Sequence, residues 1–243
     1  MMTVWVVLAV AAVITLAAGP GSRPFRSPRL SWEKWFFLFL TSAFLGCCVE
    51  AGFVWLGTGI LMSRSSLLYG AFSIVWGVGA ILMALVLNPL RRYGAWAVFA
   101  GGTVLGGGFE YLTSLVLELA YHRRFWDYSH LPLHLAGRTN LLYAAFWGVA
   151  GVVWIYWLVP HLLRLFARIP VRGGRAVGTG LAVLFALDVM ISAAAFQRMD
   201  ERSQGQAPSN HLEQLLDSWY TDRVMQFRYQ NMTVSPAGPL GLV

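Results

Sequence analysis

The chain has 243 residues, of which 57% are hydrophobic and 12% are charged, and its formal net charge is +7. A water-soluble globular domain carries about twice that share of charged residues, so the composition excludes that class and indicates an integral membrane protein. We interpret the positive charge as a signal for membrane orientation and expect no nucleic-acid partner.

Six apolar segments are separated by breaks rich in arginine, proline and glycine, as expected of loops. Several are near the ~20 residues needed to cross a bilayer. We therefore expect an all-α, polytopic membrane helix bundle with about six transmembrane helices, forming a transmembrane domain over residues 1–196. The first segment lacks the basic n-region of a signal peptide, which favours a spanning helix over a cleaved signal. The segments are Thr3–Ala18, Trp35–Met62, Leu67–Leu90, Ala95–Tyr121, Asn140–Leu163 and Ala176–Phe196.

Lysine and arginine are distributed unevenly over the five loops. The first, third and fifth loops hold ten of these residues, and the second and fourth loops hold four. Because positive loops stay in the cytoplasm, we predict a multi-pass protein of the cell membrane with both termini outside. The ten are Arg23, Arg26, Arg29, Lys34, Arg91, Arg92, Arg164, Arg168, Arg172 and Arg175, and the four are Arg64, Arg123, Arg124 and Arg138.

Two apolar segments carry acidic residues: Glu50 lies in one, and Glu110 and Glu118 lie in another. A carboxylate deep in lipid costs about 2.5–3.5 kcal/mol on insertion scales. Steps of four residues stay on one helical face, and here they place each of the first two glutamates on a stripe of small residues, which allows helices to approach closely. We therefore expect these carboxylates to face the bundle interior, with Glu118 joining the same cavity nearer the outer surface. The stripes are Ser42–Gly46–Glu50 and Gly102–Gly106–Glu110.

The two acidic segments also read alike. FLGCCVE (Phe44–Glu50) aligns without gaps with VLGGGFE (Val104–Glu110), and each is followed by a loop arginine and then by Trp-Gly. We infer a duplicated two-helix hairpin, a plan common among transporters. The later elements are Arg64 with Trp76-Gly77 and Arg138 with Trp147-Gly148.

The fourth loop, Tyr121–Asn140, is the densest polar segment, with four aromatic residues, three histidines, three arginines and Asp127. The spacing of Asp127, His130 and His134 could suit a metal, but Pro132 interrupts any helix that would align them and no further ligand completes a tetrahedral set. We therefore expect neither a metal nor another cofactor. The adjacent Cys47 and Cys48 are interpreted as packing residues.

An ionisable residue inside a membrane is a functional candidate by default. The alternative is that these residues are ion pairs that only fix helix register, and for Asp188 in the last segment the two interpretations are level. Trp126 and Tyr128 could equally belong to the interfacial aromatic belt. The candidate substrate-binding residues are Glu50, Arg64, Glu110, Glu118, Trp126, Asp127, Tyr128, His134 and Arg138.

Residues 197–243 form a polar tail. Within it, Asn210–Phe227 has apolar residues at helical spacing, and Asn210 with Glu213 resembles a capping box. We predict an amphipathic helix on the lipid surface, with a partner-binding helix as the alternative. The triplet Asn231-Met232-Thr233 matches a glycosylation acceptor.

These motifs resemble the "Putative ABC-transporter type IV" family of small bacterial membrane proteins. The likeness covers Phe37–Gly151, and Trp-Asp-Tyr-Ser with Gly-Arg is its most specific part. Departures are Ser63 and Ser65 around Arg64, where the family has Asn and Gly, Ala71 in place of proline, and His134 in place of asparagine. The matching elements are Gly46 and Glu50, Arg64 with Leu67 or Leu68 and Gly70, Gly77, Glu110-Tyr111, Glu118, Trp126-Asp127-Tyr128-Ser129, Gly137-Arg138 and Trp147-Gly148.

The resemblance implies a transport-linked membrane component. The chain has no Gly-x-x-x-x-Gly-Lys-Ser/Thr phosphate loop, and a separate ATPase subunit, although compatible with the family name, has no support in the sequence. We favour a transporter or permease that binds a cation or small polar substrate, rather than an enzyme. The alternatives are an intramembrane enzyme acting on a lipid head group, with His134 beside paired carboxylates as general acid and base, and a non-catalytic scaffold.

Overall fold

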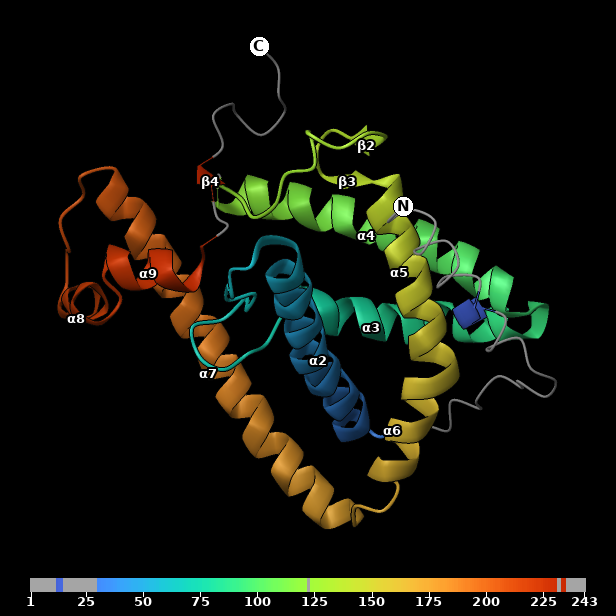
Figure 1. The fold of residues 1–243 in the computed structure, drawn as a ribbon. Coiled ribbons are helices and arrows are strands. Elements are labelled where there is room, and N and C mark those ends of the chain that lie inside the picture. The colour runs from blue at the N-terminus through green and yellow to red at the C-terminus, as the bar shows by residue number, and fades with distance from the viewer. Residues whose placement is uncertain (1–11, 15–29, 122, 231–232, 235–243) are drawn as a thin grey trace.

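The computed structural model describes residues 12–14, 30–121, 123–230 and 233–234. Over these residues the chain is all-α, as predicted, with two short antiparallel strand pairs, β1–β4 and β2–β3 (Figure 1). The α-helices are α2 (Trp32–Thr58), α3 (Ile74–Val86), α4 (Ala95–Tyr121), α5 (Leu141–Val153), α6 (Val159–Phe166), α7 (Val171–Ser203), α8 (His211–Trp219) and α9 (Asp222–Arg228). The others are the 3₁₀ helix η1 (Asn88–Tyr93), the π-helix η2 (Trp154–Leu158), β1 (Arg123–Arg124), β2 (His134–Leu135), β3 (Thr139–Asn140) and β4 (Thr233–Val234).

Some predictions fall outside the described residues. Of the predicted helix Thr3–Ala18, only residues 12–14 are described, and these are helical. The first-loop arginines Arg23, Arg26 and Arg29 and most of the Asn231-Met232-Thr233 acceptor also lie outside.

Three stretches are long and apolar enough to cross a membrane: α2, the continuous helix from α5 through η2 to α6, and α7. The helix α4 has the predicted bounds but is not among the three, because two glutamates and five glycines lower its hydropathy. The helix α3 is apolar but has only 13 residues. Length and composition therefore give three candidate spans among the described residues.

The predicted third segment, Leu67–Leu90, is not one continuous helix: its first seven residues form a loop, and only Ile74–Val86 forms α3. Gly70 turns the chain there with φ of +71°. The loop is fixed to α7, since Ser192 Oγ accepts the Leu68 N–H at 2.9 Å and Asp188 Oδ1 accepts the Tyr69 N–H at 3.2 Å. Asp188, whose role was open, therefore anchors this loop.

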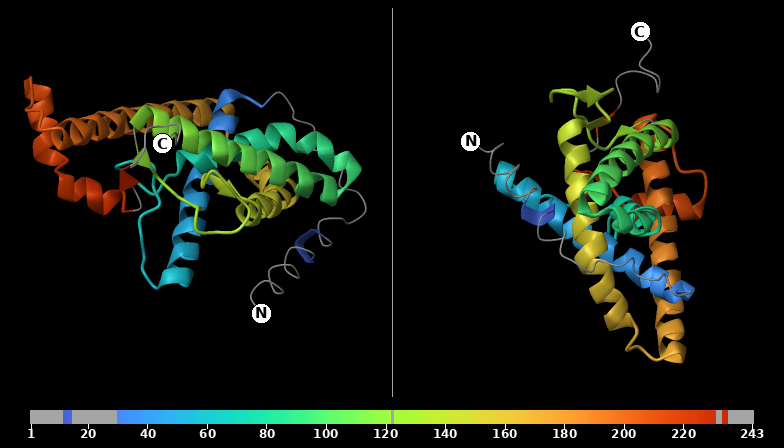
Figure 2. Two further views of the ribbon diagram at one scale, coloured as in Figure 1. Left: turned by 90° about the horizontal axis from the view of Figure 1, so that it is seen from above. Right: turned by 90° about the vertical axis from the view of Figure 1, so that its right-hand side faces the viewer.

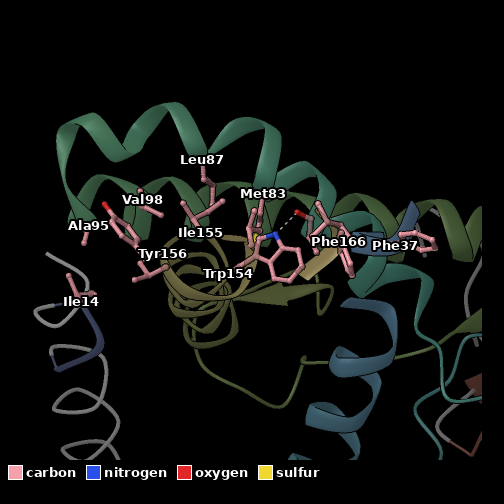
Figure 3. Close-up of a cluster of buried hydrophobic side chains, with 14 residues drawn as sticks. Ile14, Phe37, Met83, Leu87, Ala95, Val98, Trp154, Ile155, Tyr156 and Phe166 are labelled. Carbon is pink, nitrogen blue, oxygen red and sulfur yellow. Dashed lines mark hydrogen bonds between the residues drawn. The ribbon is translucent and has the colours of Figure 1, made fainter. Parts of the chain in front are cut away.

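A buried apolar cluster joins α2, α3, α4 and the α5–α6 stretch (Figure 3). Within it, Trp154 Nε1 donates to the Ala80 carbonyl of α3 at 2.8 Å. The helix widens here into η2, where the Val159 N–H bonds to the Trp154 carbonyl. Pro160 has no N–H to donate to the carbonyl four residues earlier. The missing hydrogen bond explains why the π-helix η2 lies directly before this proline.

Close packing on the glycine stripes joins α2 to α3 and α4 to α5. A side chain at Gly46 would collide with the Trp76 ring of α3, and one at Gly106 would collide with the Trp147 side chain of α5. The Trp-Gly glycines are also occluded: a side chain at Gly77 would collide with the Phe39 ring, and one at Gly148 would collide with the Thr103 hydroxyl and with Phe99. In both pairs, therefore, glycine is needed for the approach of a bulky ring.

The tail contains two helices where one was predicted. Asn210 caps α8 as expected, because its side chain accepts the Glu213 N–H at 3.0 Å, while Glu213 accepts the Ser209 N–H at 2.6 Å. The helix ends before Tyr220, and α9 starts at Asp222. Figure 2 shows both tail helices beside the C-terminal end of α7. Leu212, Leu215 and Trp219 on α8 are exposed, as membrane contact would require.

Ion pairs hold the tail helices on α7. Arg198 is buried, and its Nη2 lies 2.7 Å from Asp217 Oδ2. Arg202 pairs with Asp217 and, at 2.6 Å, with Asp222. Hydrogen bonds from Arg198, assisted by Arg202, lower the pKa of Asp217.

We therefore expect Asp217→Asn to release α8 and α9 from α7, because buried Arg198 then loses its main partner. A carboxylate with a depressed pKa stabilises the folded state above its unfolded pKa of about 3.9, and this contribution is lost as the pH falls through the folded value. Hydrogen exchange of α8 should thus rise in Asp217→Asn, and in the wild type below about pH 4. Asp222→Asn, at an exposed position, should have a smaller effect. Equal exchange in both variants would contradict this role for Asp217.

Candidate functional site

A cavity of about 820 Å³ lies between α2, α3, α4, α5, α7 and residues 228–230 of the tail. Its walls are largely aromatic and aliphatic, with a few polar groups. The ionisable acids and bases in the lining are Glu50, Arg64, Glu110 and Arg228. The glycine stripes place both carboxylates here, because the close helix contacts orient the glutamate-bearing faces of α2 and α4 inward.

Glu50 is compensated by a cation. Its Oε1 accepts a hydrogen bond from Arg64 Nε at 2.7 Å, and a second Arg64 nitrogen also contacts it. Its Oε2 accepts from Trp76 Nε1 at 3.1 Å. The side chains of Glu50 and Arg64 are 29% and 16% exposed, so this pair borders the cavity rather than lying in the packed core.

Glu110 is held differently. Its two oxygens accept hydrogen bonds from the Tyr128 hydroxyl at 2.9 Å and from the Thr139 hydroxyl at 2.8 Å. The residue is buried, and within the described part of the chain it forms no ion pair with an arginine or lysine. A carboxylate in this setting is ready to accept a cationic partner or a proton.

Glu118 and Arg138 form a separate buried pair. Arg138 Nη1 lies 2.6 Å from Glu118 Oε2, and Arg124 Nε lies 3.0 Å from Glu118 Oε1. Neither Glu118 nor Arg138 lines the cavity, although both were predicted to contribute to the site. The two predicted hairpins therefore differ in their ion pairs: Arg64 pairs with Glu50, whereas Arg138 pairs with Glu118, two turns beyond Glu110.

The remaining candidates belong to the fourth loop. Trp126 lines the cavity, and its Nε1 donates to the Arg138 carbonyl at 2.9 Å. Tyr128 also lines it. Asp127 points instead to Ser129; burial opposes ionisation, but the Ser129 N–H and hydroxyl together lower the pKa of Asp127. Asp127 also packs against Gly137 within the loop, where any side chain on residue 137 would collide with the Asp127 carboxylate.

His134 is exposed in β2 and accepts the Gly137 N–H at 3.1 Å through Nδ1. It lies outside the cavity lining, away from the carboxylates with which it was grouped. In the described residues, no three His, Cys, Asp or Glu side chains are grouped so that they could hold a metal ion.

Sequence reasoning missed two contributors to the cavity. The first is a set of aromatic rings on facing helices. Aromatic residues are common in membrane helices, so the sequence alone did not mark these rings, and only the fold brings them together. The second is the tail. Arg228 and Tyr229 both line the cavity. Arg228 donates hydrogen bonds to the Leu67 carbonyl at 2.8 Å and to the Gly70 carbonyl. Burial raises the pKa of Tyr229 to about 12, so its hydroxyl stays neutral.

A family model described as "Putative ABC-transporter type IV" matches residues 37–193. The match includes α7 up to Ala193 and is thus longer than the predicted likeness over Phe37–Gly151. No curated protein and no solved structure matches the chain. With the apolar helices, the family match identifies a membrane protein of transporter type.

Proposed function

This chain belongs to the "Putative ABC-transporter type IV" family, and from this we propose that it is a multi-pass transporter or permease component whose central cavity binds a cationic substrate. The observation that carries the assignment is Glu110, a buried cavity carboxylate held only by neutral hydroxyls. A buried carboxylate that lacks a cation is costly, and a cationic substrate would offset this cost during binding.

Duplication supports this assignment. The Gly46–Trp76 contact of α2 and α3 has its counterpart in the Gly106–Trp147 contact of α4 and α5. The two tryptophan rings also meet, with centroids 4.8 Å apart. Matching hairpins around a central site are the common architecture of secondary transporters.

We place the second and fourth loops, with Arg64 and Arg138, on the outer side of the membrane, and both termini there as well. Arg64 then acts as an outer counter-ion of Glu50. Arg138, which pairs with Glu118, holds the fourth loop in place. The enzyme alternative gains no support, because His134 lies outside the cavity lining. The odd-numbered loops, such as η1, are short, and we propose no docking site for an ATPase subunit.

Cation flux into proteoliposomes tests this function, with sodium, potassium, methylammonium and ethidium as probes. We expect the transported probe to enter at least about tenfold more slowly with Glu110→Gln, because a hydrogen bond or ion pair to a charged group contributes about 1.5–3 kcal/mol. Glu50→Gln should also slow entry. The matched acid-to-amide control Asp200→Asn, on α7 and outside the cavity lining, should leave flux unchanged. Flux that is insensitive to both cavity substitutions would reject the function.

A further inference from the structure

The size of the cavity argues against a bare inorganic ion as its occupant. About 820 Å³ lies in the range of about 300–1,000 Å³ that suits drug-sized ligands. Hard cations instead need a shell of several oxygen ligands, whereas this lining is mainly hydrocarbon. An occupant that fills the space must have an apolar body.

Aromatic rings line the region around the two carboxylates. Tyr128 and Tyr143 stack with centroids 4.6 Å apart, and Phe146 meets Tyr143 edge-on at 5.7 Å. Ring faces attract cations within about 6 Å, and an aromatic cage is the characteristic receptor of alkylated ammonium groups. The rings of the lining around Glu50 and Glu110 are Phe53, Trp76, Phe109, Tyr128, Tyr143, Phe146 and Trp147.

The charges of the cavity are arranged unequally around these rings. Arg64 already compensates Glu50, whereas Tyr128 only donates a hydrogen bond to Glu110 and supplies no charge. The same tyrosine stacks on Tyr143. A single residue thus joins the uncompensated carboxylate to the aromatic cluster, and a cation bound there would contact both.

We propose that the cavity binds an organic ammonium ion with an apolar body, whose charged head lies between Glu110 and the rings of Tyr128, Tyr143 and Phe146. This substrate class rests on the proposed function and narrows it. The apolar body occupies the space toward the aliphatic wall, where Val189 and Ala193 of α7 line the cavity.

Equilibrium binding to the full-length protein in lipid nanodiscs tests the substrate class. The probe is radiolabelled benzyltrimethylammonium, and the competitors are its neutral isostere neopentylbenzene, sodium and potassium. We expect saturable binding that the neutral isostere displaces at least about tenfold more weakly than unlabelled probe, and that sodium and potassium do not displace. This comparison uses the wild-type chain and is independent of how any variant folds.

Two variants locate the head group. Glu110→Gln should weaken binding about 10- to 150-fold. Phe146→Leu keeps an apolar side chain but removes the ring face, and should weaken binding about three- to 30-fold. The matched control is Phe44→Leu on α2, which lies outside the cavity lining and should bind as the wild type does.

Several results would overturn the assignment. Equal displacement by the neutral isostere would mean that the charge is not recognised, and equal effects of Phe146→Leu and Phe44→Leu would exclude the cage. Glu110-dependent flux of sodium or potassium without ammonium binding would refute this substrate class while leaving the transport function standing. Ammonium binding without flux of any cation would support this substrate class and refute the transport function.

Discussion

Replacing Arg138 with glutamine will lower the free energy of unfolding by about 3 kcal/mol, because removing one partner of a buried ion pair leaves the other charge stranded. Glu118 is 1% exposed, and Arg138 Nη1 lies 2.6 Å from its Oε2. Arg124 would remain beside Glu118 at 3.0 Å. Because this second cation still compensates the carboxylate in part, we expect a loss at the low end of the range for buried pairs. Thermal unfolding in detergent, followed by circular dichroism, measures the loss.

Two comparisons sharpen this expectation. Arg64→Gln should cost less, because Glu50 is 29% exposed and stays solvated at the cavity. Adding Glu118→Gln to Arg138→Gln should recover much of the stability, since the stranded carboxylate is then neutral. A loss for Arg138→Gln no greater than that for Arg64→Gln would show that the buried pair does not hold the fourth loop.

Gly106→Ala will destabilise the chain by about 2–3 kcal/mol, the upper part of the range of about 1–3 kcal/mol that overpacking typically costs. A methyl group at this position would overlap the Trp147 side chain, so α4 and α5 must separate. The matched control is Gly108→Ala on the same helix, where a methyl group meets open space and should stabilise by up to about 1 kcal/mol through helix propensity.

The predicted duplication of the hairpin leads to a parallel expectation for α2 and α3. Gly46→Ala should behave like Gly106→Ala, since its methyl group would overlap the Trp76 ring, and Gly52→Ala should behave like Gly108→Ala. The same unfolding measurement decides between the outcomes. If either tight position accepts alanine as readily as its open control, the contacts that make the hairpins alike are not formed.

Local signals predicted much of this fold. The helix α4 has the expected bounds, because Gly94 precedes it and the polar fourth loop follows it. The Asn210 cap was also read correctly, since capping depends on residues adjacent in sequence. Steps of four residues placed Glu50 and Glu110 on small-residue stripes, and both line one cavity in the structure.

Features that depend on distant contacts were not predictable in this way. The loop before α3 is apolar in sequence, but Asp188 and Ser192 of α7 fix its backbone. Likewise, only the fold decides whether Arg138 reaches Glu118 or Glu110, since both are on one side of α4. The tail helices were predicted as one because their break at Tyr220 depends on packing against α7.

Transport of a cation from water requires that the cavity bordered by α2 and α4 be open to water. Cysteine labelling tests it directly, with Cys47 and Cys48 first replaced by alanine and a membrane-impermeant methanethiosulfonate as the reagent. On α4, Thr113 lines the cavity and its neighbour Leu112 is 59% exposed on the outer face of the helix. We predict that Thr113→Cys reacts and that Leu112→Cys, facing lipid, does not. Reaction of Leu112→Cys with an inert Thr113→Cys would contradict the account.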